Sequence, residues 1–174
     1  GVKEKYDVSW PATTTASITL AAAKVTKAPA KAENLIYSGS PLVLLADGGT
    51  AEGGELAYSL DGVSYSYSLP TAVDAGNYTV WYKAVAGDEN HKDSAPAKVE
   101  NVTIAVNTDT PTVLCTQNTF RYDGTEKTPV VVVRDGANRI IPEHEYTVKL
   151  PTPRIAVGKY TVTVKDNSGG NYRF

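Results

Sequence analysis

Apolar and polar residues alternate with a period of two in several short stretches of the chain. In "YTVWYK", residues 78–83, tyrosine and valine alternate with threonine, tryptophan and lysine, and "YTVTVK" at 160–165 has the same pattern. A period of two is typical of a β-strand with one buried face. We therefore predict two matching strands, with Val80 and Val162 in the core and the threonines between them facing solvent.

Turn signals separate these alternating stretches. Asp61-Gly62 stands between the runs "LAYSL" and "VSYSYSL", and Asp135-Gly136 stands between "VVVVR" and "ANRII". Asp-Gly is the strongest short hairpin signal, because a type I′ turn needs a positive φ at both central residues. Two β-hairpins are predicted at these positions.

The same order of motifs occurs twice. "LPTAVDAGNYTVWYK" begins at Leu69, and "LPTPRIAVGKYTVTVK" begins at Leu150. Upstream of each lies a Tyr-x-Gly corner followed by a proline and an apolar strand, "IYSGSPLVLL" from Ile36 and "RYDGTEKTPVVVV" from Arg121. No stretch has a helical period. Short strands with turns between them indicate two all-β units, each a β-sandwich.

Composition and length agree with this interpretation. The chain has 174 residues with 11 tyrosines, 14 glycines, 10 prolines and no methionine, which suits strands and turns better than helices. A repeat offset of about 80 residues favours two small domains, and we expect independent cores that meet near residues 105–109. The single Cys115 excludes a disulfide within the chain, and we expect it to be buried and inert.

The charge pattern and the length of the apolar stretches argue against two kinds of interaction. There are 17 basic and 19 acidic residues, a formal net charge of −2, and no basic run that could follow a phosphate backbone. The longest apolar stretches, such as 42–46 and 130–133, are far too short to cross a bilayer. We expect neither nucleic-acid binding nor membrane insertion of this chain.

The ordered motifs carry a family resemblance. From "KAPAKAENLIYSGSPLVLL" to "KVENVTIA" the chain resembles a bacterial immunoglobulin-like repeat of the cell-surface and secreted proteins of gut anaerobes, and "FRYDGTEKTPVVVVRDG" to "GKYTVTVKDNSGGNY" resembles a sister type. The resemblance implies tandem immunoglobulin-like β-sandwich domains at 23–106 and 107–174, after tail strands of a preceding repeat at 1–22. It also implies an extracellular or cell-surface location and a stalk or adhesion module with an unidentified protein or glycan partner.

Trp81 is the candidate binding residue. By alternation it lies on the polar face of its strand, where Thr163 lies in the second repeat. An exposed aromatic side chain on a sheet can stack on a sugar, which gives a carbohydrate-binding module as the alternative function. The competing interpretation is that Trp81 packs under a loop or against the neighbouring domain.

Other chemistry has weaker support. "GDENHKDS" places Asp88, Asn90 and Asp93 in one loop, which suggests calcium, but the Asp-x-Asp-x-Asp-Gly frame is missing and polar residues are typical of any surface loop. The two histidines, His91 and His144, lie at non-equivalent positions, and no nucleophile motif accompanies either. We therefore expect no metal, no cofactor and no enzymatic activity.

The two ends suggest a further hypothesis. After Asn90-His91 the first repeat continues through a closing strand that contains "ENVTIAV", whereas only Arg173 and Phe174 follow the corresponding Asn171-Tyr172. We expect the second domain to lack its last strand, and "ASITLAAAKV" at 16–25 resembles that strand. Head-to-tail self-association through the N-terminal strand is one interpretation. The alternatives are truncation of both neighbouring repeats and folding back of the strand onto its own first domain.

Overall fold

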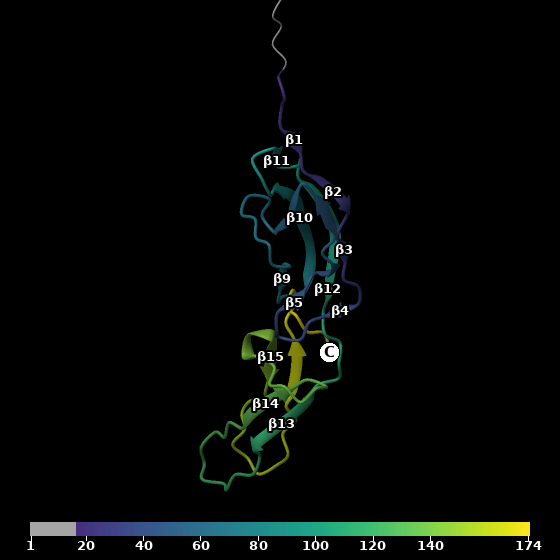
Figure 1. The fold of residues 1–174 in the computed structure, drawn as a ribbon. Helices are drawn as coiled ribbons and strands as arrows, with labels where there is room; N and C mark the ends of the chain where they lie inside the picture. Colours follow the sequence, from purple (N-terminus) through teal and green to yellow (C-terminus); the bar gives the residue numbers. More distant parts are fainter. Residues whose placement is uncertain (1–16) are drawn as a thin grey trace, which may run out of the picture.

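The computed structural model describes residues 17–174 and is all-β, as expected from the alternation. The elements follow one another along a long axis, from β1 and β11 at one end to β13 and β14 towards the other (Figure 1). We call residues 17–106 the N-terminal part and residues 107–174 the C-terminal part. Among the described residues, no helix is long and apolar enough to cross a membrane. The expected tail at 1–22 falls mostly on residues 1–16, which lie outside the described region.

A four-stranded sheet forms the centre of the N-terminal part, in the order β4-β12-β10-β8. β10 pairs antiparallel with both β8 and β12, and β4 adds to the far edge of β12 in parallel. The strands are β4 (Leu35–Ile36), β8 (Gly54–Ser59), β10 (Gly76–Ala86) and β12 (Ala97–Ala105).

Shorter strands pair around this sheet. They form the pairs β1-β11, β2-β7, β3-β6 and β5-β9, of which only β1-β11 is parallel. Their bounds are β1 (Ala21–Ala22), β2 (Lys24–Lys27), β3 (Ala30–Lys31), β5 (Leu42–Val43), β6 (Leu45–Asp47), β7 (Thr50–Glu52), β9 (Thr71–Ala72) and β11 (His91–Lys92).

The C-terminal part contains two antiparallel strand pairs, β13-β14 and β15-β16. A single 3₁₀ turn, η1 (Glu143–Glu145), leads into β15. The strands are β13 (Thr112–Gln117), β14 (Val130–Arg134), β15 (Tyr146–Lys149) and β16 (Thr163–Asp166).

The predicted face assignment is confirmed in the N-terminal part. Val80, Tyr82 and Ala84 of β10 are buried, and Val102 and Ile104 of the adjacent β12 are buried with them. The prediction was wrong for the second repeat. Val162 is only half-buried and precedes β16, because no strand equivalent to β12 covers it among residues 17–174.

The predicted hairpin at Asp61-Gly62 forms only in part. The Asp61 carboxylate accepts hydrogen bonds from the backbone N–H groups of Val63 and Ser64, and these bonds close a tight turn after β8. The run that follows is not a strand, since one bridge, Tyr58 to Ser66, is its pairing with β8. Val63 is 82% exposed and Tyr67 is 58% exposed, so most of the apolar side chains of this run face solvent, although Tyr65 is half-buried.

The two parts share buried contacts, whereas the sequence led us to expect separate cores. One continuous cluster of buried side chains runs from Leu44 and Val80 to Val133 and Tyr146. Tyr37 and Tyr172 join its two halves, with ring centroids 5.3 Å apart in an edge-to-face arrangement. Residues 105–109 are therefore part of a packed junction, and not a free linker.

The last residues of the repeated motif pair antiparallel with an earlier strand in both parts. Trp81 lies opposite Ser59 and Tyr82 opposite Tyr58, and their sequence equivalents Thr163 and Val164 lie opposite Lys149 and Val148. The repeated motifs thus encode a repeated strand pair. β10 has a second partner in β12, but β16 has no second partner within the described chain.

Val80→Asp should unfold the N-terminal part. The side chain is fully buried, and an unpaired carboxylate there should lower the free energy of unfolding by about 4 kcal/mol, close to the whole stability of a small domain. The matched change Thr79→Asp, on the other face of β10, should cost about 1 kcal/mol or less. Urea denaturation followed by circular dichroism measures both, and a larger loss for Thr79→Asp would show that the faces are reversed.

Candidate functional site

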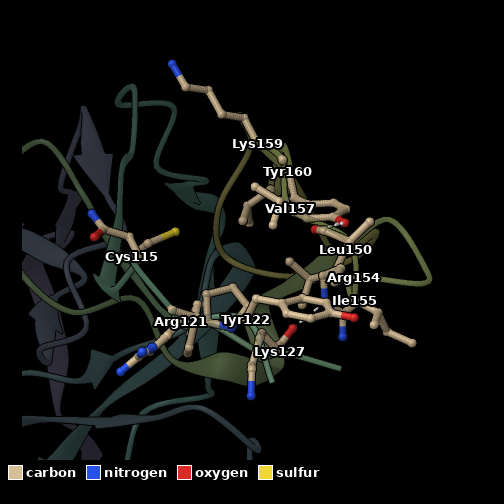
Figure 2. A pocket seen from close by; sticks show the side chains of 16 residues that line it. Cys115, Arg121, Tyr122, Lys127, Leu150, Arg154, Ile155, Val157, Lys159 and Tyr160 are labelled. Carbon is tan, nitrogen blue, oxygen red and sulfur yellow. Dashed lines mark hydrogen bonds between the residues drawn. The ribbon is translucent and has the colours of Figure 1, made fainter. Parts of the chain in front are cut away.

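An open apolar groove lies in the C-terminal part, between the segment after β13 and the loop that leads into β16. Its cavity volume is about 420 Å³. Figure 2 shows Val157 and Tyr160 on one side and Arg121 and Tyr122 on the other. The lining residues are Cys115, Asn118, Phe120, Arg121, Tyr122, Lys127, Pro129, Leu150, Arg154, Ile155, Ala156, Val157, Gly158, Lys159, Tyr160 and Val162.

Buried Arg154 joins the two walls of this groove. Its Nε donates to the carbonyl of Lys127 at 2.7 Å, and its guanidinium also donates to the carbonyl of Pro151 at 2.8 Å. The Glu126 carboxylate lies 3.2 Å from the guanidinium. A buried arginine keeps this geometry only while its donors are satisfied, so Arg154 fixes the 150–156 loop against residues 126–128.

Some of the charged side chains that line the groove are held in ion pairs. Lys127 is paired with Asp123 and Arg154 with Glu126, which leaves Arg121 and Lys159 as the charges without an ion pair among its lining residues. No histidine or carboxylate is among the residues that line the groove. Apolar walls with a few charged residues on the rim are typical of a site for an apolar segment.

Trp81 is half-buried and does not stand free on the sheet. The Lys98 ammonium lies 4.2 Å from the centre of the indole ring. On the Asp61-Gly62 turn, a Cβ atom built on Gly62 would come within 3.1 Å of that ring, so the turn packs directly against it. The contacts agree with the interpretation that Trp81 packs under a loop.

The acidic loop uses its carboxylates for internal bonds. Asp88 accepts hydrogen bonds from the His91 ring and from the backbone of Asn90, and the His91 bond is the main reason that the pKa of Asp88 is lowered. Asp93 pairs with Lys83 at 2.7 Å. Within residues 17–174, no group of three or more potential metal ligands converges.

Neither histidine is near the groove. His91 packs against Gly53, where an added Cβ would lie 2.6 Å from the ring. His144 is exposed, and its ring lies 3.6 Å from the Glu145 carboxylate. Cys115, which was expected to be buried, is half-buried on the groove wall.

A second site lies at the junction, which is organised around Asn107. Its backbone N–H donates to the carbonyl of Asn171 at 2.8 Å, and its carbonyl accepts from the N–H of Arg173 at 2.8 Å. Its side-chain amide reaches back 3.4 Å to the carbonyl of Tyr37. Asn107 therefore links the end of β12 to both parts of the chain.

Charged and aromatic groups pack beside Asn107. Asp135 is buried and accepts bonds from the Arg139 guanidinium at 2.7 Å and from the Tyr172 hydroxyl at 3.4 Å. Burial alone would raise the pKa of Asp135, but the bonds from Arg139 more than offset it, so this pKa is lowered. Arg139 also donates to the carbonyl of Ser38 in the N-terminal part.

Asn171 completes the junction on the other side. Its side-chain oxygen accepts from the N–H of Ala75 at 2.7 Å, and its amide nitrogen donates to Asp74 at 3.3 Å. The same nitrogen donates to the buried Glu145 at 2.8 Å. One asparagine thus ties the loop before β10 to the turn before β15.

Sequence reasoning missed both the groove and the junction. Asn107 stands outside the repeated motifs, and Arg154 lies within "LPTPRIAVGKYTVTVK" at a position where the first copy has no arginine. Apart from contacts within its own loop, each residue has its hydrogen-bond partners 20 or more residues away. Asn171 and Tyr172 did carry a signal, since they correspond to Asn90 and His91. That correspondence suggested a repeat boundary, but gave no indication of contact with Tyr37 or Ala75.

Comparison with known proteins gives no relative for this chain. No protein-family model, no curated protein and no solved structure matches it.

The stability of the junction should fall at alkaline pH because of Tyr172. Burial, followed by the charge of Asp135, raises the pKa of Tyr172 to about 12 from an ordinary value of 10.0. A raised pKa means that the stabilisation is complete below pH 10 and is lost as the pH rises towards 12, by about 3 kcal/mol in total.

Denaturation curves recorded across this alkaline range measure the effect. Tyr172→Phe keeps the ring and removes the ionising group, so its stability should fall less steeply than that of the wild type. Parallel pH profiles for the two proteins would show that folding does not shift the pKa of Tyr172.

Proposed function

We propose that this chain is a non-enzymatic stalk or adhesion module of a bacterial surface protein, built from tandem immunoglobulin-like β-sandwich domains. The boundaries are those expected from the repeats, 23–106 and 107–174. In this proposal the chain works by geometry, since each domain holds the next at a fixed distance and angle. The location is extracellular or at the cell surface.

The observation that carries the proposal is a junction motif that occurs twice. Asn107 pairs in parallel with Tyr172, and Ala21 pairs in parallel with His91. Tyr172 and His91 are equivalent positions in the two repeats. Ala21 therefore pairs with the N-terminal part at the same position at which Asn107 pairs with the C-terminal part. A chain that enters each unit by the same pairing is what a tandem array requires.

The junction between the two parts is built for a fixed angle. Tyr37 packs on Tyr172, Arg139 reaches Ser38, and Asn171 reaches Ala75, so three separate contacts join the parts. Several separate contacts hold the two parts against bending better than a single contact would. Leaving a buried polar group without a hydrogen-bond partner costs free energy, so each polar contact also resists opening of the junction.

The carbohydrate-binding alternative gains no support at Trp81. Stacking on a sugar needs a bare ring face, whereas Lys98 and the Gly62 turn both lie against this indole. Trp81 is better explained as a packing residue between β10, β12 and the turn after β8.

A distance measurement between spin labels tests the rigid junction. Labels at Glu52→Cys in β7 and Lys165→Cys in β16, in a Cys115→Ser background, report on the two parts from exposed positions. We expect a narrow distance distribution by double electron–electron resonance. Asn171→Ala removes the bonds to Ala75, Asp74 and Glu145, and should broaden the distribution.

Asn90→Ala is the matched control, because Asn90 is the equivalent residue in the first repeat and its side chain is exposed. Its distribution should be the same as that of the labelled parent protein. A broad distribution in the parent protein, or no change with Asn171→Ala, would contradict the proposal.

A further inference from the structure

β12 is the strand that covers the edge of β10 in the N-terminal part. In the N-terminal part it lies between β4 and β10, and Val102 and Ile104 project from it into the core with 0% and 1% of their surface exposed. From Val99 to Ala105 its partners are Leu35, Ile36, Gly76, Asn77, Tyr78 and Val80.

The sequence repeats map these six partners onto the C-terminal part. Leu35 and Ile36 correspond to Phe120 and Arg121, and the stretch Gly76 to Val80 corresponds to 158–162. The six equivalent residues are Phe120, Arg121, Gly158, Lys159, Tyr160 and Val162, and all six line the groove. The groove therefore occupies the position that β12 fills in the first repeat.

The edge beside this groove is available for pairing. β16 pairs with β15, and no other strand among residues 17–174 pairs with it. An unpaired edge presents backbone N–H and C=O groups that accept a further strand. The occupant must then be an extended segment, antiparallel to 158–166, with apolar side chains at alternate positions.

Residues 17–20 of the same chain have these properties. Ile18 is 102% exposed and Leu20 is 52% exposed, and neither lies in a strand. Because Ala21 pairs with His91 as Asn107 pairs with Tyr172, Ile18 corresponds to Ile104 and Leu20 to Val106. This segment therefore has the position of the last residues of a β12-like strand, without a sheet to cover it.

The segment lies at the opposite end of the molecule from the groove. Residues 17–20 precede β1 at one end, while β13 and the groove segments lie at the other (Figure 1). Residues 17–20 cannot reach the groove of their own molecule, so they can enter only the groove of a second copy.

We propose that the Ser17–Leu20 segment of one molecule docks in the groove of the next, as an added strand beside Tyr160 and Val162. The inference rests on the proposed repeat architecture. Each contact then reproduces the relation of β12 to the N-terminal part. Strand and groove lie at different ends of each copy, so the interface is heterologous and gives head-to-tail chains without a closed ring of two.

Sedimentation velocity on the full chain, at concentrations up to about 1 mM, tests the proposal. The wild type should form oligomers whose mean size grows with concentration. Ile18→Asp should be monomeric at every concentration, and its fold should be unchanged because Ile18 makes no buried contact. Val63→Asp is the matched control at another exposed β-branched residue, and it should associate like the wild type.

Mixing two variants identifies the surfaces. Val162→Asp blocks the groove and keeps the strand, whereas Ile18→Asp keeps the groove, so the mixture should give 1:1 dimers and nothing larger. Circular dichroism checks that Val162→Asp is folded. If Val162→Asp is not folded, a synthetic peptide of residues 12–22 is used in its place. This peptide should dissociate wild-type oligomers. The same peptide with Ile18→Asp should not.

A wild type that stays monomeric throughout, or oligomers that persist in Ile18→Asp, would overturn the proposal. Its failure is distinguishable from failure of the proposed function. The spin-label distances can be measured on the Ile18→Asp monomer, where association has no influence on the junction between the two parts.

Discussion

The structure depends on satisfying the backbone of Asn107 while it is buried between the two parts. A buried N–H and C=O must have partners, and Asn107 finds them in Asn171 and Arg173, at the far end of the described chain. That requirement brings residues 171–173 back beside the end of β12. Once they are there, Tyr172 lies against Tyr37 and Asn171 lies within reach of Ala75. The long axis of the molecule follows from this one pairing.

The two repeats differ mainly in what covers their central strands. β10 runs for 11 residues between two partners, while β16 runs for four residues with one. The two copies share Tyr-Thr-Val, yet residues 78–80 lie in a strand and 160–162 do not, so local propensity does not explain this difference. Burial does, because Val80 is closed in by β12 and Val162 opens onto the groove. A strand is extended and ordered by its neighbours as much as by its own residues.

Alternation predicted much of the fold. It identified the all-β class and the buried face of β10. It was wrong after Asp61, where Val63 continues the alternation but lies in solvent. A period of two describes a surface that can be buried, and only the tertiary structure decides whether another layer arrives to bury it. For the same reason, the half-buried state of Val162 could not be read from "YTVTVK". The groove and the junction depend on contacts such as Arg154 with Lys127 and Asn107 with Asn171, which no local pattern encodes.

The direction of β12 has a mechanical consequence. This strand runs along the long axis and passes directly into the Asn107 junction (Figure 1). Its antiparallel hydrogen bonds to β10 lie across that axis, because such bonds are perpendicular to the strands. A pulling force applied along the molecule would therefore load these bonds in shear, and they would have to break together. Tension directed across the sheet would open them one at a time, at a much lower force, so the module is strongest in the direction in which it is longest.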